Sequence, residues 1–269
     1  MLKAALIFIV LVCTMGSVRA QVSALPPEVQ QAILAGGPVI NGDVNKATTA
    51  ALAPLHASSP PADVKEAVNV RYGPDEAQHL DVFIPQKDGA TAAPGAVLIF
   101  VPGGGFATVD QRPDGLASYG GDLNQVVLMG HSAGASHVAD YIARATSAGG
   151  PPVRGAILIS GTYDLSSVPA SGNNARYYSD DPALRADRSA TRGLMASRIP
   201  MLLVAAELDP APTVQQAEQL HAALCGRGSA QCPRLLRLAG HNHFSEVFDI
   251  GTADREFANE IATFVRQPM

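Results

Sequence analysis

The most constraining stretch of the sequence is residues 125–136, which read QVVLMGHSAGAS. The apolar run at residues 126–129 predicts a buried strand, and a helical pattern begins just after Ser132. Between them, residues 130–134 have the form G-x-S-x-G. Small residues two positions before and after the serine permit a turn so sharp that its hydroxyl projects from a sheet edge. The stretch therefore predicts a nucleophilic serine, and the alternative is a glycine-rich turn with an incidental serine.

Short apolar runs recur along the chain and alternate with helical patterns. Residues 67–72 and 80–85 alternate apolar and polar side chains around a short turn, which predicts an antiparallel hairpin. Later runs are continuously apolar, the pattern of parallel strands that are covered on both faces. We therefore predict an α/β fold of three layers, in which helices cover a mostly parallel sheet opened by the hairpin. The continuous runs are residues 96–101, 126–129, 156–159 and 201–205, and a last strand is expected at residues 235–238.

Acidic and histidine side chains follow the later strands. A serine hydroxyl becomes nucleophilic when a histidine takes its proton, and a carboxylate must hold that histidine. Asp209 lies just past the carboxyl end of a strand, where ligand-facing side chains of open α/β sheets gather. Glu207 is the alternative acid, although its place nearer the strand favours a buried structural role. His243 follows the last strand and is our choice of base, with His241 as the alternative.

A glycine-rich loop follows the strand at residues 96–101. Residues 102–106 read PGGGF, and three glycines let the backbone approach a substrate and direct its N–H groups at a developing negative charge. We expect N–H groups of this loop and the N–H group of Ala133, the residue after the serine, to form such an oxyanion hole. The alternatives are a flexible loop or a phosphate-binding loop, but the sequence has neither a following Lys-Ser/Thr nor a G-x-G-x-x-G pattern.

The N-terminus has the pattern of an export signal. Lys3 precedes an apolar run, and a small-residue cleavage site ends at Ala20, so residues 1–20 are expected to be a signal peptide. The alternative is a retained anchor, although the run is short for a membrane-spanning helix. We expect a secreted or periplasmic protein without stable membrane association after cleavage. The formal net charge of −5 leaves no basic surface, so nucleic acid is not an expected partner.

The remaining chain divides into two expected parts. Residues 21–64 are rich in Pro, Ala and Ser, and we interpret them as a helical appendage or a loosely ordered linker. Residues 65–269 form the main domain. Cys225 and Cys232 are the cysteines of the mature chain, and an oxidising compartment favours a disulfide between them. No Cys/His spacing suggests a metal site, and we expect no cofactor.

Seven phrases carry a family resemblance, at residues 70–74, 80–83, 102–106, 119–122, 130–134, 207–210 and 241–244. Together they resemble α/β-hydrolases of the esterase/lipase group, and most of all BD-FAE-like carboxylesterases and kynurenine-formamidase-like enzymes. The resemblance covers about residues 68–265. It implies the α/β-hydrolase fold, with Ser132 as nucleophile, Asp209 as acid and His243 as base. It also implies that the N–H groups of Gly104, Gly105 and Ala133 are the oxyanion donors.

The resemblance also implies a reaction. A carboxylesterase of this kind cleaves small acyl esters through a covalent acyl-enzyme, without a cofactor. An amidase or arylformamidase would differ only in the shape of its pocket. The expected partner is therefore a small-molecule acyl ester.

Two departures from the family pattern affect this expectation. Pro102 stands where the family usually has histidine, and the interval from Gly103 to Ser132 is about half the usual length. The family's fourth strand and its flanking helices are therefore expected to be missing. The hairpin must then shift by one strand spacing, about 4.8 Å, to pair with residues 96–101, or leave two sheet edges unpaired. A non-catalytic or impaired hydrolase-like protein is the second hypothesis.

Overall fold

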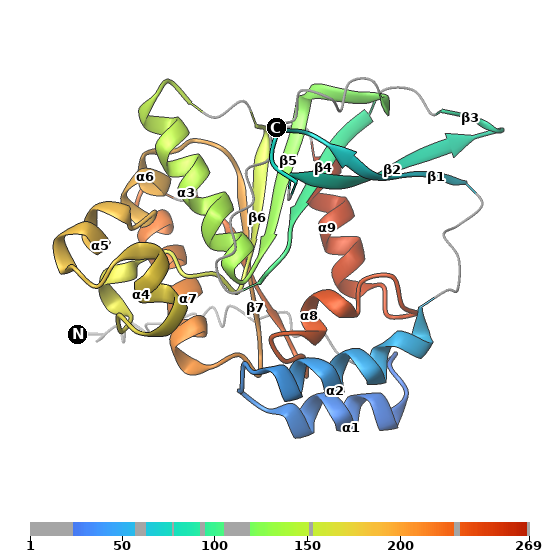
Figure 1. Ribbon diagram of the computed structural model, residues 1–269, viewed down its shortest axis with the longest axis horizontal. Helices are drawn as coiled ribbons and strands as arrows, with labels where there is room; N and C mark the ends of the chain where they lie inside the picture. The colour runs from blue at the N-terminus through green and yellow to red at the C-terminus, as the bar shows by residue number, and fades with distance from the viewer. Residues whose placement is uncertain are drawn as a thin grey trace, which may run out of the picture.

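The structure is a computed structural model, and it describes residues 24–56, 63–76, 78–91, 95–104, 119–150, 153–228 and 232–267. Among these residues, the centre of the molecule is a sheet of five parallel strands that lie side by side in chain order (Figure 1). The predicted parallel sheet is confirmed. Its strands are β4 (Gly95–Val101), β5 (Gly121–His131), β6 (Gly155–Ile159), β7 (Met201–Ala206) and β8 (Arg234–Leu238).

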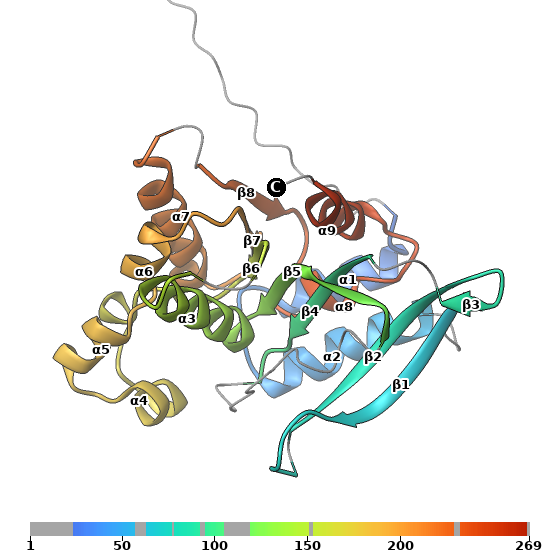
Figure 2. The same cartoon turned by 90° about the horizontal axis from the view of Figure 1, so that it is seen from above.

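The predicted hairpin is also present and forms a sheet of its own. Strand β1 (Val64–Arg71) pairs antiparallel with β2 (His79–Lys87), and the short β3 (Ala90–Thr91) pairs with the end of β2. Figure 2 shows this small sheet on the β4 side of the main sheet. Within the described residues, β2 and β4 do not pair, so each sheet keeps an edge of its own.

The inner strands and the outer strand β4 differ in burial. Every residue of β6 and of β7 is buried, as their continuous apolar sequences predict. In β4, by contrast, Leu98 is 39% exposed and Phe100 is 40% exposed. The expectation that both faces of β4 are covered is therefore wrong. Its physical reason is position, because a strand at the edge of a sheet has a neighbour on one side only.

Helices cover the two faces of the main sheet and complete the predicted three layers. One face carries α3 (Ala133–Ser147), α6 (Thr191–Ala196) and α7 (Ala211–Cys225), and α9 (Glu256–Arg266) lies on the other (Figure 1). From β4 to β8, each strand is added on the same side of the one before it. Because the crossovers between parallel strands are right-handed, the helices that connect these strands lie on one face of the sheet.

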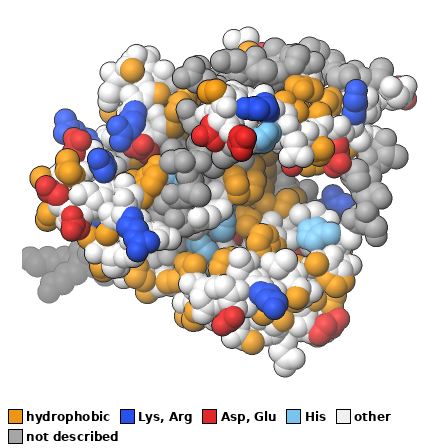
Figure 3. Space-filling model, viewed as in Figure 1, with side chains coloured by type: hydrophobic (Ala, Val, Ile, Leu, Met, Phe, Trp, Pro, Cys, Tyr) orange, Lys and Arg blue, Asp and Glu red, His pale blue; other side chains and the backbone are white. Residues whose placement is uncertain are grey.

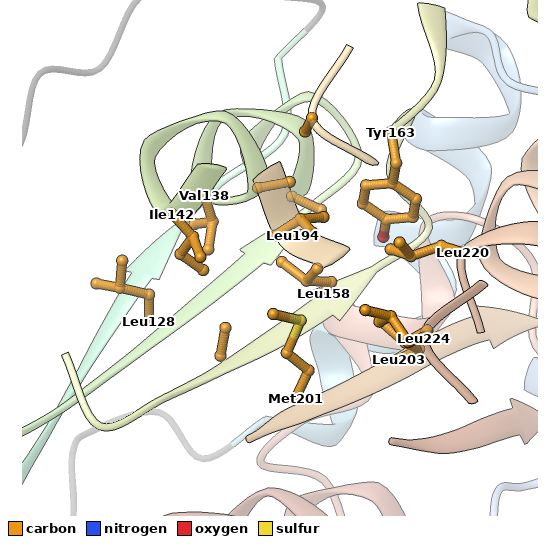
Figure 4. Close-up of a cluster of buried hydrophobic side chains, with 14 of the residues drawn as sticks. Leu128, Val138, Ile142, Leu158, Tyr163, Leu194, Met201, Leu203, Leu220 and Leu224 are labelled. Atoms are coloured by element: carbon orange, nitrogen blue, oxygen red, sulfur yellow. The ribbon is translucent and has the colours of Figure 1, made fainter. Parts of the chain in front are cut away.

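Each face of the sheet has its own hydrophobic core. Successive strand residues point to opposite faces, so Leu158 joins the core under α3, whereas Ile157 and Ile159 face α9. Figure 4 shows the first of these cores, in which leucines of the strands meet side chains of α3, α6 and α7. Phe257 and Phe264 of α9 close the second core.

The N-terminal region forms a pair of helices beneath the carboxyl ends of the strands. Helices α1 (Pro27–Gly36) and α2 (Gly42–Leu52) pack on each other and on α8 (Ser245–Phe248) (Figure 1). Four buried residues form a third, separate core there, and Leu208 and Phe248 pack against it. Those four residues are Leu25, Val29, Ile33 and Leu52.

The remaining described helices are short and lie in connections. They are the 3₁₀ turns η1 (Ala53–Leu55) and η3 (Leu165–Ser167), and the helices α4 (Gly172–Tyr178) and α5 (Pro182–Arg188). A disulfide joins Cys225 at the end of α7 to Cys232 just before β8. None of the helices in the described ranges has the length and apolarity needed to cross a bilayer. The predicted signal peptide at residues 1–20 lies outside the described residues.

Candidate active site

Ser132 occupies a strained turn between β5 and α3. Its backbone φ is +55°, a conformation that costs of order 1–3 kcal/mol for a residue other than glycine. Its N–H donates to the Ile159 carbonyl at 2.8 Å, which ties the turn to β6. Both motif glycines are sterically required, because a Cβ atom at Gly130 would collide with the Gly134 backbone, and one at Gly134 with the Val101 carbonyl. Close packing alone therefore accounts for glycine at the first and last positions of the G-x-S-x-G motif.

A chain of hydrogen bonds joins Ser132, His243 and Asp209. His243 Nε2 lies 2.8 Å from the Ser132 hydroxyl oxygen, and His243 Nδ1 lies 2.7 Å from Asp209 Oδ1. A carboxylate only accepts, so Nδ1 carries the proton and Nε2 is left to accept from the hydroxyl. The three residues follow β5, β7 and β8, and the sheet brings these strand ends to one edge. The arrangement is suited to taking a proton from the serine.

The Asp209 carboxylate is buried and fixed at both oxygens. Its second oxygen, Oδ2, accepts from the Ser160 hydroxyl at 2.5 Å and from the Ala206 N–H at 2.9 Å. Glu207, the alternative acid, instead accepts from the Gly240 N–H at 2.7 Å. Glu207 is exposed, so our expectation that it is buried is wrong, because its side chain leaves the strand end to hold the next loop.

The alternative base, His241, is directed elsewhere. Its Nδ1 lies 3.1 Å from the Ser245 hydroxyl, and its Nε2 faces Asp249 at 4.0 Å. Burial lowers the pKa of His241, although the nearby Asp254 carboxylate opposes this shift. Of the two histidines, only His243 lies within hydrogen-bond distance of Ser132.

Two buried titratable residues beside His243 were not singled out as functional from the sequence. His131 Nε2 lies 2.8 Å from the His243 carbonyl oxygen and 3.2 Å from Glu246 Oε1. The two histidine rings are 4.7 Å apart. Burial lowers the pKa of His131 to about 4, so this imidazole stays neutral at neutral pH. Burial, reinforced by the Asp209 charge, raises the pKa of Glu246 well above its usual value.

The donor atoms of His131, His243 and Glu246 lie within 4.8 Å of one another, as the ligands of a metal would. The hydrogen bonds argue against ligation, however. His131 Nε2 donates to a carbonyl, which can only accept, and His243 Nδ1 donates to Asp209. Neither of these nitrogens has a lone pair to offer a cation. With these hydrogen bonds in place, the cluster is not arranged to hold a metal.

Two of the three expected oxyanion donors, Ala133 and Gly104, fall within the described residues. Ala133 is buried at the start of α3, and Gly104 lies just beyond the end of β4. Gly103 packs closely on the turn, because a Cβ atom there would be 3.1 Å from Ser132 Cβ. Gly105 falls outside the described residues. Figure 3 shows a hollow on this face of the molecule, floored by hydrophobic side chains, with histidine side chains along its lower border.

Comparisons with known proteins identify the fold. Residues 106–231 match the family described as alpha/beta hydrolase fold. No curated protein sequence matches the chain. Similar solved structures include a Pyrobaculum calidifontis esterase, at 18% identity and a TM-score of 0.60, which covers 90% of this chain and 98% of that one.

Two further similar structures are also esterases. A fungal esterase from Rhizomucor miehei is 17% identical with a TM-score of 0.57, and covers 90% of this chain and 97% of its own. Esterase B of Lactobacillus rhamnosis, inhibited by a tributyrin phosphonate, is 17% identical with a TM-score of 0.61, and covers 91% and 96%. At these identities the likeness establishes architecture. The chain therefore has the α/β-hydrolase fold that its motifs predict.

Proposed function

We propose that the protein is a serine hydrolase that cleaves small carboxylic esters. One observation carries the proposal, namely the hydrogen-bonded sequence Asp209–His243–Ser132 with the serine held on a strained turn. An Asp–His ion pair that only stabilises the fold does not require a neighbouring serine at positive φ. A serine nucleophile that must project from the sheet edge requires this turn. The esterases with a similar fold support the same reaction class.

In the proposed reaction, Ser132 Oγ attacks the ester carbonyl carbon while His243 Nε2 takes the hydroxyl proton. Asp209 holds the imidazole and stabilises the imidazolium that forms. The N–H groups of Ala133, Gly104 and Gly105 stabilise the oxyanion. His243 then protonates the leaving alcohol, and an acyl-enzyme remains. Water deprotonated by His243 attacks the acyl-enzyme, which releases the acid and restores the serine.

The substrate is proposed to carry a short acyl chain and an uncharged alcohol. The hollow in Figure 3 is floored by hydrophobic side chains, which favours an apolar substrate. The phosphonate that inhibits Esterase B of Lactobacillus rhamnosis is a tributyrin analogue, which agrees with a short-chain ester. Within the esterase/lipase group, the motifs favour the BD-FAE-like carboxylesterases.

Two further proposals concern the chain itself. We propose that the family's fourth strand is missing, because β4 is the outer strand of the main sheet among the described residues and the hairpin stands apart from it. We also propose that the protein is exported, because the pattern of residues 1–20 is that of a signal peptide and a disulfide suits an oxidising compartment.

Hydrolysis of p-nitrophenyl acetate by the purified mature protein tests the main proposal. We expect turnover that Ser132→Ala abolishes, and labelling by a fluorophosphonate that the same variant prevents. Cooperative thermal unfolding of both proteins serves as the control for folding. A folded wild-type protein that neither turns over the ester nor takes the label would contradict the proposal and favour a non-catalytic hydrolase-like protein.

A further inference from the structure

Asn242, the residue before His243, joins the histidine loop to both N-terminal helices. Its side chain is fully buried. The amide nitrogen Nδ2 donates to the Ile33 carbonyl of α1 at 3.2 Å and to the Thr48 hydroxyl of α2 at 3.1 Å. Thr48 is fully buried as well. The two helices therefore contact the loop through a polar group that water does not reach.

The other end of the same amide holds the backbone around His243. Asn242 Oδ1 accepts from the N–H of Phe244 and from that of Ser245, both at 3.0 Å. Because Oδ1 faces N–H donors and Nδ2 faces a carbonyl and a hydroxyl, flipping the amide would break these bonds. One side chain thus fixes the loop on one side and the helices on the other.

The helix pair also packs against the loop that carries Asp209. Leu208, which precedes Asp209, lies on the small core that α1 and α2 form, together with Phe248 of α8. His56, just after the helices, has its Nε2 2.8 Å from the Phe248 carbonyl oxygen. This core is separate from the two cores of the main sheet. The helices therefore act on the loops around the site rather than on the sheet.

We propose that α1 and α2 position His243, with Asn242 and Thr48 as the positioning residues. The inference rests on the proposed hydrolase activity. No hydrogen bond joins the helices to Ser132 in the described structure, and they act through the backbone that sets the imidazole. A displacement of about 1 Å in a catalytic group can lower a rate by 10²-fold, so even a small shift of this loop is measurable.

Thr48→Val tests the proposal with a minimal change. Valine has the shape of threonine but offers no acceptor to Asn242 Nδ2, so a buried N–H loses a partner. Thr48→Ser keeps the hydroxyl and should restore the wild-type values. Thr49→Val is the matched control, because Thr49 lies next along α2, is exposed, and bonds only within the helix to Asn45.

We expect Thr48→Val to lower kcat for p-nitrophenyl acetate about tenfold while KM changes less than twofold. The downfield proton resonance of His243 Nδ1–H should broaden or shift in this variant and not in Thr49→Val. A folded Thr48→Val protein with wild-type kcat and an unchanged resonance would overturn the proposal. If valine prevents folding, Thr48→Ala makes the same comparison with less bulk, and the same two readouts decide it.

The outcomes separate this inference from the proposed function. Absence of turnover by the wild-type protein counts against the hydrolase proposal. The His243 resonance then still shows whether α1 and α2 hold the loop. If the wild-type protein is active and Thr48→Val is equally active, only the positioning role is lost.

Discussion

The outer strand β4 and the inner strands β6 and β7 of the main sheet have similar sequences but different surroundings. Strands β4, β6 and β7 are all continuously apolar, yet β6 and β7 are buried at every residue whereas β4 exposes Leu98 and Phe100. The inner strands have a strand on each side and helices on both faces. A continuous apolar sequence therefore indicates that a strand should be buried on both faces. How far it is buried depends on its place in the sheet.

The candidate site is divided between inner and outer strands. Ser132 and Asp209 follow the inner strands β5 and β7, and His243 follows β8, the outer strand opposite β4. Gly104, an expected oxyanion donor, follows the exposed strand β4. Two of the three proton-transfer groups thus follow inner strands, and one of the expected donors of the oxyanion hole follows the less covered strand β4. Four predictions test this difference, from the largest effect to the smallest.

The largest effect is expected at the buried acid. Asp209→Asn should lower kcat for p-nitrophenyl acetate on the order of 10⁴-fold, because an amide stabilises the wrong tautomer of His243 and cannot stabilise the imidazolium. Steady-state kinetics measure the change. Glu207→Gln is the matched control, since Glu207 is exposed and holds only the Gly240 N–H. An equal loss in Glu207→Gln would contradict the choice of acid.

The next effect concerns packing around the inner strand β7. Leu203 of β7 is fully buried in the core beneath α7, so Leu203→Ala should lower the free energy of unfolding by about 2–5 kcal/mol. Urea denaturation followed by circular dichroism measures the loss. A decrease below about 1 kcal/mol would mean that the core around β7 can close over the missing side chain.

The third prediction concerns His131, which links the serine turn to the histidine loop. Its pKa is lowered by burial to about 4, so between pH 6.5 and 4 the unfolded chain binds more protons than the folded one. Stability contributed by neutral His131 is therefore present above pH 6.5 and lost as the pH falls towards 4. The free energy of unfolding should fall by on the order of 3 kcal/mol over this pH range.

A difference measurement isolates this effect. His131→Gln cannot gain the proton, so the unfolding free energy of wild type relative to this variant should fall as the pH is lowered from 6.5 to 4. Burial raises the pKa of Asp249 to about 6, which acts in the opposite direction but is common to both proteins. The groups that face His131 are Glu246, His243 and Asp209. A difference that does not vary with pH would refute the assignment.

The smallest effect is expected in the outer strand β4. Leu98→Ala in β4 should lower the free energy of unfolding by less than about 1 kcal/mol, because 39% of this side chain is already exposed. The same urea titration used for Leu203→Ala measures it. If the two substitutions lower the free energy of unfolding equally, β4 is as well covered in solution as β7, and the difference between the outer and the inner strand disappears.

Patterns that are local in the sequence predicted the elements of the fold. The continuous runs at β6 and β7, the alternating hairpin strands and the glycines of the serine turn each depend on neighbouring residues. The exposure of β4 was not predictable in this way, because it depends on which strands and helices come to lie beside it. Glu207 was misjudged for a related reason, since its partner Gly240 belongs to another loop.

The site was predictable where a motif fixed it and not where distant residues complete it. Ser132 was named from the G-x-S-x-G motif, and Asp209 and His243 from their places after strands. The structure brings the three side chains together. Ser160, Glu246 and the Asn242–Thr48 contact carried no local signal. Ser160, for example, reaches Asp209 only because β6 and β7 are neighbours in the sheet. Such contacts join residues far apart in sequence, and only the folded chain reveals them.

The placement of α9 has a consequence for the order in which the protein is completed. Phe257, Ile261 and Phe264 supply the cover for Val127, Ile157 and the other residues on one face of the sheet. Synthesis runs from the N-terminus, so that face stays open until the segment containing α9 has emerged. A nascent chain that has reached β8 already holds all of the proposed proton-transfer partners except His243, yet it still exposes a large apolar surface. We expect folding to wait for this last helix, and chains that stop before Glu256 to aggregate.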